Sequence, residues 1–280
     1  MVKQIISAHD DAKINVFLYD VPNPKAVIHI IHGFGEGAWH YSDLSNFFVQ
    51  NNFAAVVHDQ RGFGDMSELS TKEKRRLQGV IPGYDYFLAD IKTVYALITQ
   101  RYPKIPVVLY GHSMGGNIAI SHLVQFPAEN YSKLILESPW LRLYSPVQVI
   151  ATRFVAVLSK IFPNFTISTG LDPANIARNR EKTSALNSDG IYHGRISLKM
   201  FTEITQAGEL AIKNAKKITL PTLLLCAGQD KIVCPNAIKE FAAAANSNVQ
   251  LIEYPDGYHN LHLDSIADKM LTDVVNFVLT

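Results

Sequence analysis

The 280-residue sequence has only two cysteines, Cys226 and Cys234, and its charged residues are few and balanced. Two cysteines cannot form a disulfide framework, and they are typical of reduced thiols in a cytoplasmic protein. Lys and Arg number 26 against 25 Asp and Glu, a balance that argues against a nucleic-acid-binding protein. The sequence has no apolar run of the ~20 residues that span a bilayer and no apolar secretory signal near residue 1. We therefore expect a globular cytoplasmic protein that binds no nucleic acid.

Short apolar runs alternate with helical patterns along most of the chain. Nearly continuous apolar strands that alternate with helices are typical of a parallel sheet covered on both faces. The predicted fold class is therefore α/β, with a mostly parallel sheet flanked by helices. Strands are expected at 13–20, 26–31, 54–58, 107–110, 133–137, 222–226 and 249–254, and helices at 42–51, 84–101, 113–126, 236–245 and 265–278.

The alternation fails between residues 139 and 210, where no convincing strand is visible. This stretch contains a strongly apolar helical segment from Ser145 to Phe162, with Pro146 at its start and Pro163 after its end. We interpret the stretch as a helical cap inserted between two strands of the sheet. Residues 1–138 and 211–280 would then form the core, and residues 139–210 the cap.

The clearest chemical signal is the stretch 111–116, in which Ser113 is flanked by glycines two residues away on each side. An apolar run precedes it and a helical pattern follows it, which is the context of a nucleophile elbow. Glycines at these positions let neighbouring backbone approach a sharp strand-to-helix turn without a Cβ clash. The pattern predicts that Ser113 is a nucleophile.

A serine hydroxyl is a weak nucleophile and needs a base that a third group orients. Asp230 follows the expected strand 222–226, and His259 follows the expected strand 249–254. The carboxyl ends of parallel strands share one edge of the sheet, so these side chains can converge with Ser113. We predict Asp230 and His259 as the remaining members of a catalytic triad.

Other residues could compete for these roles. His262 is a rival base one helical turn beyond His259, while Asp256 and Asp264 are rival carboxylates that fit better as a turn residue and a helix cap. Six further histidines are expected at core edges or on the surface: His9, His29, His58, His112, His122 and His193.

A tetrahedral intermediate also needs two N–H groups that point at its oxyanion. One is expected from Met114, the residue after the nucleophile. The other is expected from Phe34, which lies between Gly33 and Gly35 after the strand 26–31.

These motifs resemble the α/β-hydrolases of the monoacylglycerol lipase and lysophospholipase group, which is also grouped with serine aminopeptidase-like hydrolases. The resemblance runs through most of the chain, in the stretches 32–41, 59–64, 110–116, 138–141, 220–233 and 257–262. It implies the α/β-hydrolase fold, the same five site residues, and a cap that forms a lipophilic tunnel for an acyl chain.

The resemblance thus implies a serine ester hydrolase that acts on a small single-chain lipid ester, without a metal or organic cofactor. A thioesterase or an aminopeptidase with the same triad is an alternative, and a non-catalytic binding protein of this fold is a more distant one. The cap would make transient contact with a membrane surface. The basic run 72–76, expected to be a solvated loop near the active-site edge, would touch anionic headgroups.

Overall fold

The computed structural model describes residues 1–145 and 155–280. Its centre is an eight-stranded sheet with the order β1-β2-β4-β3-β5-β6-β9-β10. β2 pairs antiparallel with β1 and β4, and the remaining pairs are parallel. The predicted α/β class is confirmed. The strands are β1 (Val2–Ser7), β2 (Lys13–Tyr19), β3 (Val27–Ile31), β4 (Ala54–His58), β5 (Val107–His112), β6 (Tyr131–Glu137), β9 (Thr222–Ala227) and β10 (Val249–Tyr254).

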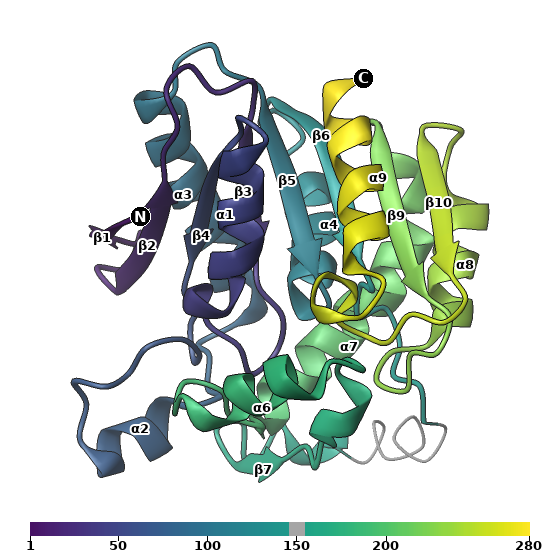
Figure 1. Ribbon diagram of the computed structural model, residues 1–280. Helices are drawn as coiled ribbons and strands as arrows, with labels where there is room; N and C mark the ends of the chain where they lie inside the picture. Colours follow the sequence, from purple (N-terminus) through teal and green to yellow (C-terminus); the bar gives the residue numbers. More distant parts are fainter. Residues whose placement is uncertain (146–154) are drawn as a thin grey trace.

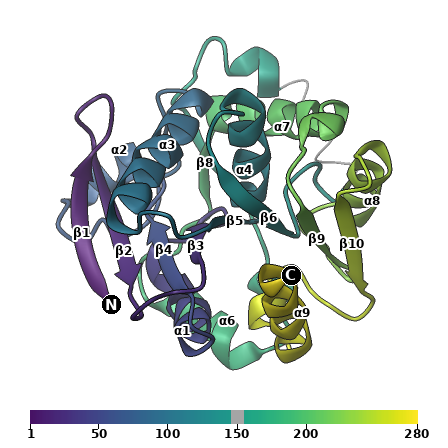
Figure 2. The ribbon, with the colours of Figure 1, turned by 90° about the horizontal axis from the view of Figure 1, so that it is seen from above.

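Helices cover both faces of this sheet, as Figure 2 shows from above. One face carries α1 and α9, and the other carries α3, α4 and α8. Successive residues of a strand point to opposite faces, so every inner strand must be apolar on both sides. In β3, Val27 and Ile31 join one buried cluster while Ile28 and Ile30 join the other. The helices are α1 (Ser42–Gln50), α3 (Tyr84–Arg101), α4 (Met114–Gln125), α8 (Pro235–Ala244) and α9 (Ala267–Leu279).

Further elements lie below the carboxyl ends of the strands in Figure 1, between β6 and β9 in the chain. Contrary to the expectation of no strand in this stretch, β7 and β8 pair antiparallel. Each of them has only three residues, which is too short for a periodic pattern to reveal. The elements are β7 (Thr166–Ser168), α6 (Arg180–Ser188), β8 (Arg195–Ser197) and α7 (Leu198–Lys213).

The expected helix from Ser145 to Phe162 falls partly on residues 146–154, which lie outside the described residues. Its described part is helical over 155–158 and continues in turns to 161. The expected cap boundary at residue 210 falls inside α7, which packs against α4 and α8 of the core. The division into core and cap therefore stays a prediction, and α7 belongs to both layers by its contacts.

The basic run 72–76 is helical rather than a loop, because it lies in α2 (Thr71–Leu77). The Ser70 side chain accepts from the Glu73 backbone N–H, and the Glu73 carboxylate accepts from the Ser70 backbone N–H. This reciprocal capping box satisfies N–H groups at the start of the helix. Lys72, Arg75 and Arg76 are exposed and Lys74 is partly buried. The helix lies beside the elements below the sheet in Figure 1.

Candidate active site

Ser113 lies at the sharp turn from β5 into α4, with φ 52° and ψ −117°. A positive φ is costly for a residue with a side chain, so the surrounding structure must impose it. Gly115 shows how tight the turn is, because a Cβ built on it would lie 2.1 Å from the carbonyl oxygen of Ile31. The glycine lets α4 begin directly against the end of β3, which holds the Ser113 hydroxyl above the sheet edge.

The structure brings the three predicted triad side chains into one hydrogen-bonded chain. The His259 Nε2 atom lies 2.8 Å from the Ser113 Oγ atom, and His259 Nδ1 lies 2.7 Å from Asp230 Oδ2. The other oxygen of Asp230 accepts from the backbone N–H groups of Ile232 and Val233, at 2.8 and 2.9 Å. These bonds fix the carboxylate, which in turn fixes the imidazole ring against the hydroxyl.

The electrostatics of the imidazole suit a general base. Burial alone would lower the pKa of His259, but the adjacent Asp230 carboxylate, together with the charges of Glu36 and Glu137, raises that pKa above its usual value. The ring therefore gains affinity for the proton that it would take from Ser113. All three side chains are buried, which strengthens these interactions by excluding water.

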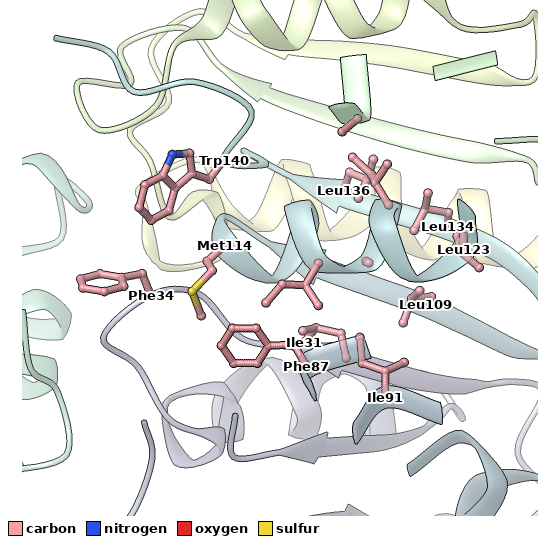
Figure 3. Packing of buried hydrophobic residues seen from close by; sticks show 14 of the residues in the cluster. Ile31, Phe34, Phe87, Ile91, Leu109, Met114, Leu123, Leu134, Leu136 and Trp140 are labelled. Atoms are coloured by element: carbon pink, nitrogen blue, oxygen red, sulfur yellow. The ribbon is translucent and has the colours of Figure 1, made fainter. Parts of the chain in front are cut away.

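The two expected oxyanion donors come from different elements: Met114 directly follows Ser113, and Phe34 lines the same cavity as Ser113. Met114 is the first residue of α4, where backbone N–H groups lack a partner within the helix. Within 1–145 and 155–280, neither the Met114 N–H nor the Phe34 N–H donates to a protein acceptor. Both N–H groups are therefore free to bind an oxyanion. Figure 3 shows the Met114 side chain beside the Phe34 ring, which also meets Phe63 and Trp140 edge-on.

A cavity of about 190 Å³ opens beside Ser113 and His259. Its wall comes from the core on one side and from the elements between β6 and β9 on the other. Most of the lining side chains are apolar, and a narrow apolar space beside a nucleophile suits an acyl chain better than a charged group. The apolar lining residues are Phe34, Trp140, Leu143, Val155, Ile167, Leu171, Ile176, Tyr192, Ile196, Phe201 and Ile232.

The family described as serine aminopeptidase, S33 matches residues 22–266, a range that includes all of the predicted site residues. The chain belongs to this family.

Relatives of this S33-family chain carry lipase names. It is 25% identical over 289 residues to the monoacylglycerol lipase of Mycolicibacterium smegmatis. The match covers 100% of this chain and 99% of that protein. It is 28% identical over 260 residues to the monoglyceride lipase of Rattus norvegicus, at 91% and 80% coverage.

Other relatives are longer than this S33-family chain. The chain is 27% identical over 245 residues to a Schizosaccharomyces pombe protein whose name contains monoglyceride lipase, with 86% of the chain and 63% of that protein covered. It covers 26% of an abhydrolase domain-containing protein of Dictyostelium discoideum.

Solved structures agree with the fold of this S33-family chain. The soluble variant of monoglyceride lipase from Saccharomyces cerevisiae, in complex with a substrate analog, superposes with a TM-score of 0.86. It is 23% identical and the match covers 98% of this chain and 94% of that one. At this identity the likeness concerns the fold alone.

The rival residues of this S33-family chain have other partners. His262 Nδ1 lies 2.9 Å from both carboxylate oxygens of Glu137. Asp264 accepts from Arg178 and from the Tyr258 N–H. Neither residue contacts Ser113 or His259 by a hydrogen bond.

Among the described residues, one group has the ligand types and spacing to hold a metal ion: His112, Glu137 and His262, whose ligand atoms lie within 4.8 Å of one another. The Glu137 oxygens already accept from Tyr110 and from His262. Burial opposes ionisation of Glu137, yet its histidine neighbours lower its pKa to about 2. The group is thus accounted for as an internal ion-pair network.

Four polar residues near Ser113 were not predicted as part of the site. His112 was expected at a core edge, but it lines the cavity together with Glu36 and Asn260, and Tyr41 bonds to two of these residues. The signal in the sequence was weak. Glu36 follows the Phe34 loop by two residues, Asn260 follows His259, and His112 precedes Ser113, so adjacency to predicted residues was the available clue.

Proposed function

We propose that this protein is a serine hydrolase that cleaves single-chain lipid esters, such as monoacylglycerols or lysophospholipids, through an acyl-enzyme intermediate. The observation that carries the proposal is the hydrogen-bonded chain from Asp230 through His259 to Ser113 beside an apolar cavity. The names of the relatives support the same substrate class.

The proposed reaction has two halves. His259 takes the proton of Ser113 as the hydroxyl oxygen attacks the ester carbonyl, and Asp230 stabilises the imidazolium that forms. The N–H groups of Phe34 and Met114 bind the oxyanion, the C–O bond to the alcohol breaks, and His259 returns its proton to the leaving alcohol. Water then attacks the acyl-enzyme in the same way, which releases the fatty acid and restores Ser113.

The catalytic assignment is tested by labelling with a fluorophosphonate probe, which reacts with activated serines. The wild-type protein should be labelled and should hydrolyse 4-nitrophenyl butyrate, and Ser113→Ala should lose both properties. Retained labelling in Ser113→Ala, or no labelling of the folded wild-type protein, would contradict the proposal. The second result would instead favour a non-catalytic binding protein of this fold.

The substrate class is tested by rates across monoacylglycerols, lysophospholipids, diacylglycerols, acyl-CoA and peptide amides. Each buried methylene contributes about 0.8 kcal/mol, so kcat/KM should rise with chain length from acetyl to medium-chain monoesters. A steady fall from butyrate to palmitate would reject an acyl tunnel. Preference for acyl-CoA would favour the thioesterase alternative, and preference for peptide amides would favour the aminopeptidase alternative.

Lysophospholipids belong in the panel because one relative is named phospholipase YtpA, from Bacillus subtilis. It is 27% identical, and the match covers 88% of this chain and 92% of that protein.

We also propose that the cavity faces a membrane surface while it takes up its substrate. Val157, Ile161, Phe162 and Phe165 are 58–64% exposed, a concentration of large apolar side chains that a water-facing loop rarely has. The basic helix α2 lies on the same side of the molecule, and Gly79 just after it bonds to Ser197 at the end of β8. Apolar side chains with flanking cations suit an anionic lipid surface.

Sedimentation with phosphatidylcholine vesicles, with and without phosphatidylglycerol, tests the membrane contact. Phe162→Ser combined with Phe165→Ser should reduce binding to both vesicles, whereas Arg75→Gln combined with Arg76→Gln should reduce it for anionic vesicles only. Rates on a soluble butyrate ester should stay unchanged in both variants. If a variant lost vesicle binding and hydrolysis of the soluble ester to the same extent, the membrane contact would be contradicted.

No helix in the described part of the chain is long and apolar enough to cross a membrane.

A further inference from the structure

Glu36 is a buried carboxylate that the proposed reaction does not use. It lies in the loop between β3 and the 3-10 helix Ala38–Tyr41, and its side chain lines the cavity. Its Oε2 atom accepts from the Gly33 backbone N–H at 2.9 Å and from the Tyr41 hydroxyl at 2.5 Å. Its Oε1 atom accepts from the Asn260 side chain at 2.8 Å. One carboxylate thus binds three donors.

Each of these donors lies next to a member of the catalytic site. Gly33 precedes Phe34, the expected oxyanion donor, and Asn260 follows His259. The Tyr41 hydroxyl also lies 2.7 Å from Nδ1 of His112, the residue before Ser113. Glu36 therefore joins its own loop to the loop that holds Asn260, and the Tyr41 hydroxyl connects it to the turn at Ser113 through His112. The Glu36 to Asn260 bond alone joins residues 224 positions apart.

We propose that Glu36 is a positioning residue. It holds three segments in the mutual geometry that acyl transfer needs: the oxyanion loop at Phe34, the nucleophile turn at Ser113 and the histidine loop at His259. This inference rests on the proposed function. Glu36 acts through its neighbours: it fixes where the Phe34 N–H points and where the His259 backbone lies. The site needs such a brace because donor positions must match the oxyanion to within a few tenths of an ångström.

The carboxylate form is essential to this role. Burial opposes its charge, but the adjacent His112 ring and the Tyr41 hydroxyl outweigh burial and hold the pKa of Glu36 well below its usual range. An ionised carboxylate accepts at both oxygens, whereas an amide accepts at only one. In Glu36→Gln, the amide NH₂ group must face either the Asn260 NH₂ group or the Gly33 N–H. In either orientation the NH₂ group faces another donor, so a hydrogen bond is lost and one of the loops loosens.

The chain offers a matched control in a second buried carboxylate. Glu137 accepts from the Tyr110 hydroxyl as Glu36 accepts from the Tyr41 hydroxyl, and both tyrosines are fully buried. The Glu137 side chain binds His262, which has no place in the proposed reaction. Tyr41→Phe and Tyr110→Phe therefore each remove a buried hydroxyl that donates to a glutamate, but only the Tyr41 hydroxyl also bonds to Gly33 and His112.

The experiment compares the wild-type protein with Glu36→Gln, Tyr41→Phe and Tyr110→Phe on 4-nitrophenyl butyrate. Active sites are counted by fluorophosphonate titration, so that each kcat refers to folded, reactive enzyme. Glu36→Gln should lose about 100-fold in kcat with little change in KM, as expected when an oxyanion donor is misplaced. Tyr41→Phe should lose about tenfold, and Tyr110→Phe less than threefold.

A second measurement reads the oxyanion site directly. An alkyl trifluoromethyl ketone forms a tetrahedral adduct with the serine, so its affinity should fall in Glu36→Gln by about the same factor as kcat/KM, while a fatty alcohol of equal length binds unchanged. Normal kcat per titrated site in Glu36→Gln would overturn the proposal and leave Glu36 with a purely structural role. Equal losses in Tyr41→Phe and Tyr110→Phe would also overturn it. Failure of the proposed function is a separate result, since the wild-type protein itself would then show no labelling or hydrolysis.

Discussion

At the scale of single residues, Asp230 controls both the orientation and the basicity of His259. Asp230→Asn keeps the side-chain shape but replaces an acceptor of the His259 ring by an NH₂ group or a neutral carbonyl. We expect kcat on a soluble ester to fall by a factor of about 10⁴, as it does for the corresponding change in a serine protease triad.

The same residue sets the pH dependence of the reaction. His259 acts as a base only when it is neutral, and the Asp230 carboxylate raises its pKa above the usual value. The ratio kcat/KM should therefore rise with pH along a single ionisation whose apparent pKa lies above 6.5. In Asp230→Asn that apparent pKa should move down, and a pH profile of the variant checks the shift. An unchanged or higher apparent pKa would show that another group controls the base.

The sequence could predict that Ser113, Asp230 and His259 would come together, because each lies at the carboxyl end of an expected parallel strand. It could not predict that Tyr41 and Asn260 would both donate to Glu36. The bond from Asn260 depends on how two segments far apart in the sequence fold over the sheet edge, and no local pattern encodes that arrangement. A polar residue beside a predicted catalytic residue was the remaining signal, and it is too common to be decisive.

At the scale of elements, the small β7–β8 sheet forms part of the cavity wall through Ile167 and Ile196. Ile167 is 36% exposed, so it can be changed with little cost to folding. Ile167→Ser should lower kcat/KM for a decanoyl ester by about three- to tenfold while the acetyl ester changes less than twofold, because only the long chain reaches the wall. Rates on the two soluble esters, each divided by titrated active sites, provide the measurement.

Val157→Ser is the matched control for that prediction. Val157 is apolar and 61% exposed, but it is not among the residues that line the cavity. Its substitution should leave the decanoyl to acetyl ratio of a soluble pair unchanged. If Ile167→Ser and Val157→Ser changed the ratio equally, the acyl chain would not run along β7.

The inner strands could be predicted because burial on both faces makes them apolar throughout. The strand β1 was missed because its residues are mostly exposed and its pairing with β2 imposes no apolar pattern. The strands β7 and β8 were missed because their pairing joins Ile167 to Ile196 across the intervening chain. By contrast, α2 could have been recognised from the local pair Ser70 and Glu73, which form its capping box.

At the scale of the whole molecule, buried histidines make the stability depend on pH. His29 of β3 and His58 of β4 are fully buried near the sheet centre, with ring centroids 5.6 Å apart. Burial and the neighbouring histidines lower the pKa of both rings, for His58 to about 3. In the unfolded chain a histidine has a pKa near 6.5, so below that pH it binds a proton that it does not bind in the folded protein. Stability from these rings is therefore complete above pH 6.5 and is lost as the pH falls toward 3.

Between pH 7 and pH 5, the linkage for one such histidine amounts to about 2 kcal/mol of unfolding free energy. His259 and His262 act in the opposite direction, because their pKa values are raised in the folded protein. A comparison of wild type with His58→Gln isolates the effect, since Gln does not titrate and the other groups stay in place. Urea unfolding at pH 7 and pH 5 measures how much unfolding free energy each protein loses on acidification. This loss should be smaller by about 2 kcal/mol in the variant than in the wild type, whatever the variant's stability at pH 7. An equal loss in both proteins would mean that His58 binds its proton as readily in the folded protein as in the unfolded chain, which its burial in β4 between β2 and β3 makes unfavourable.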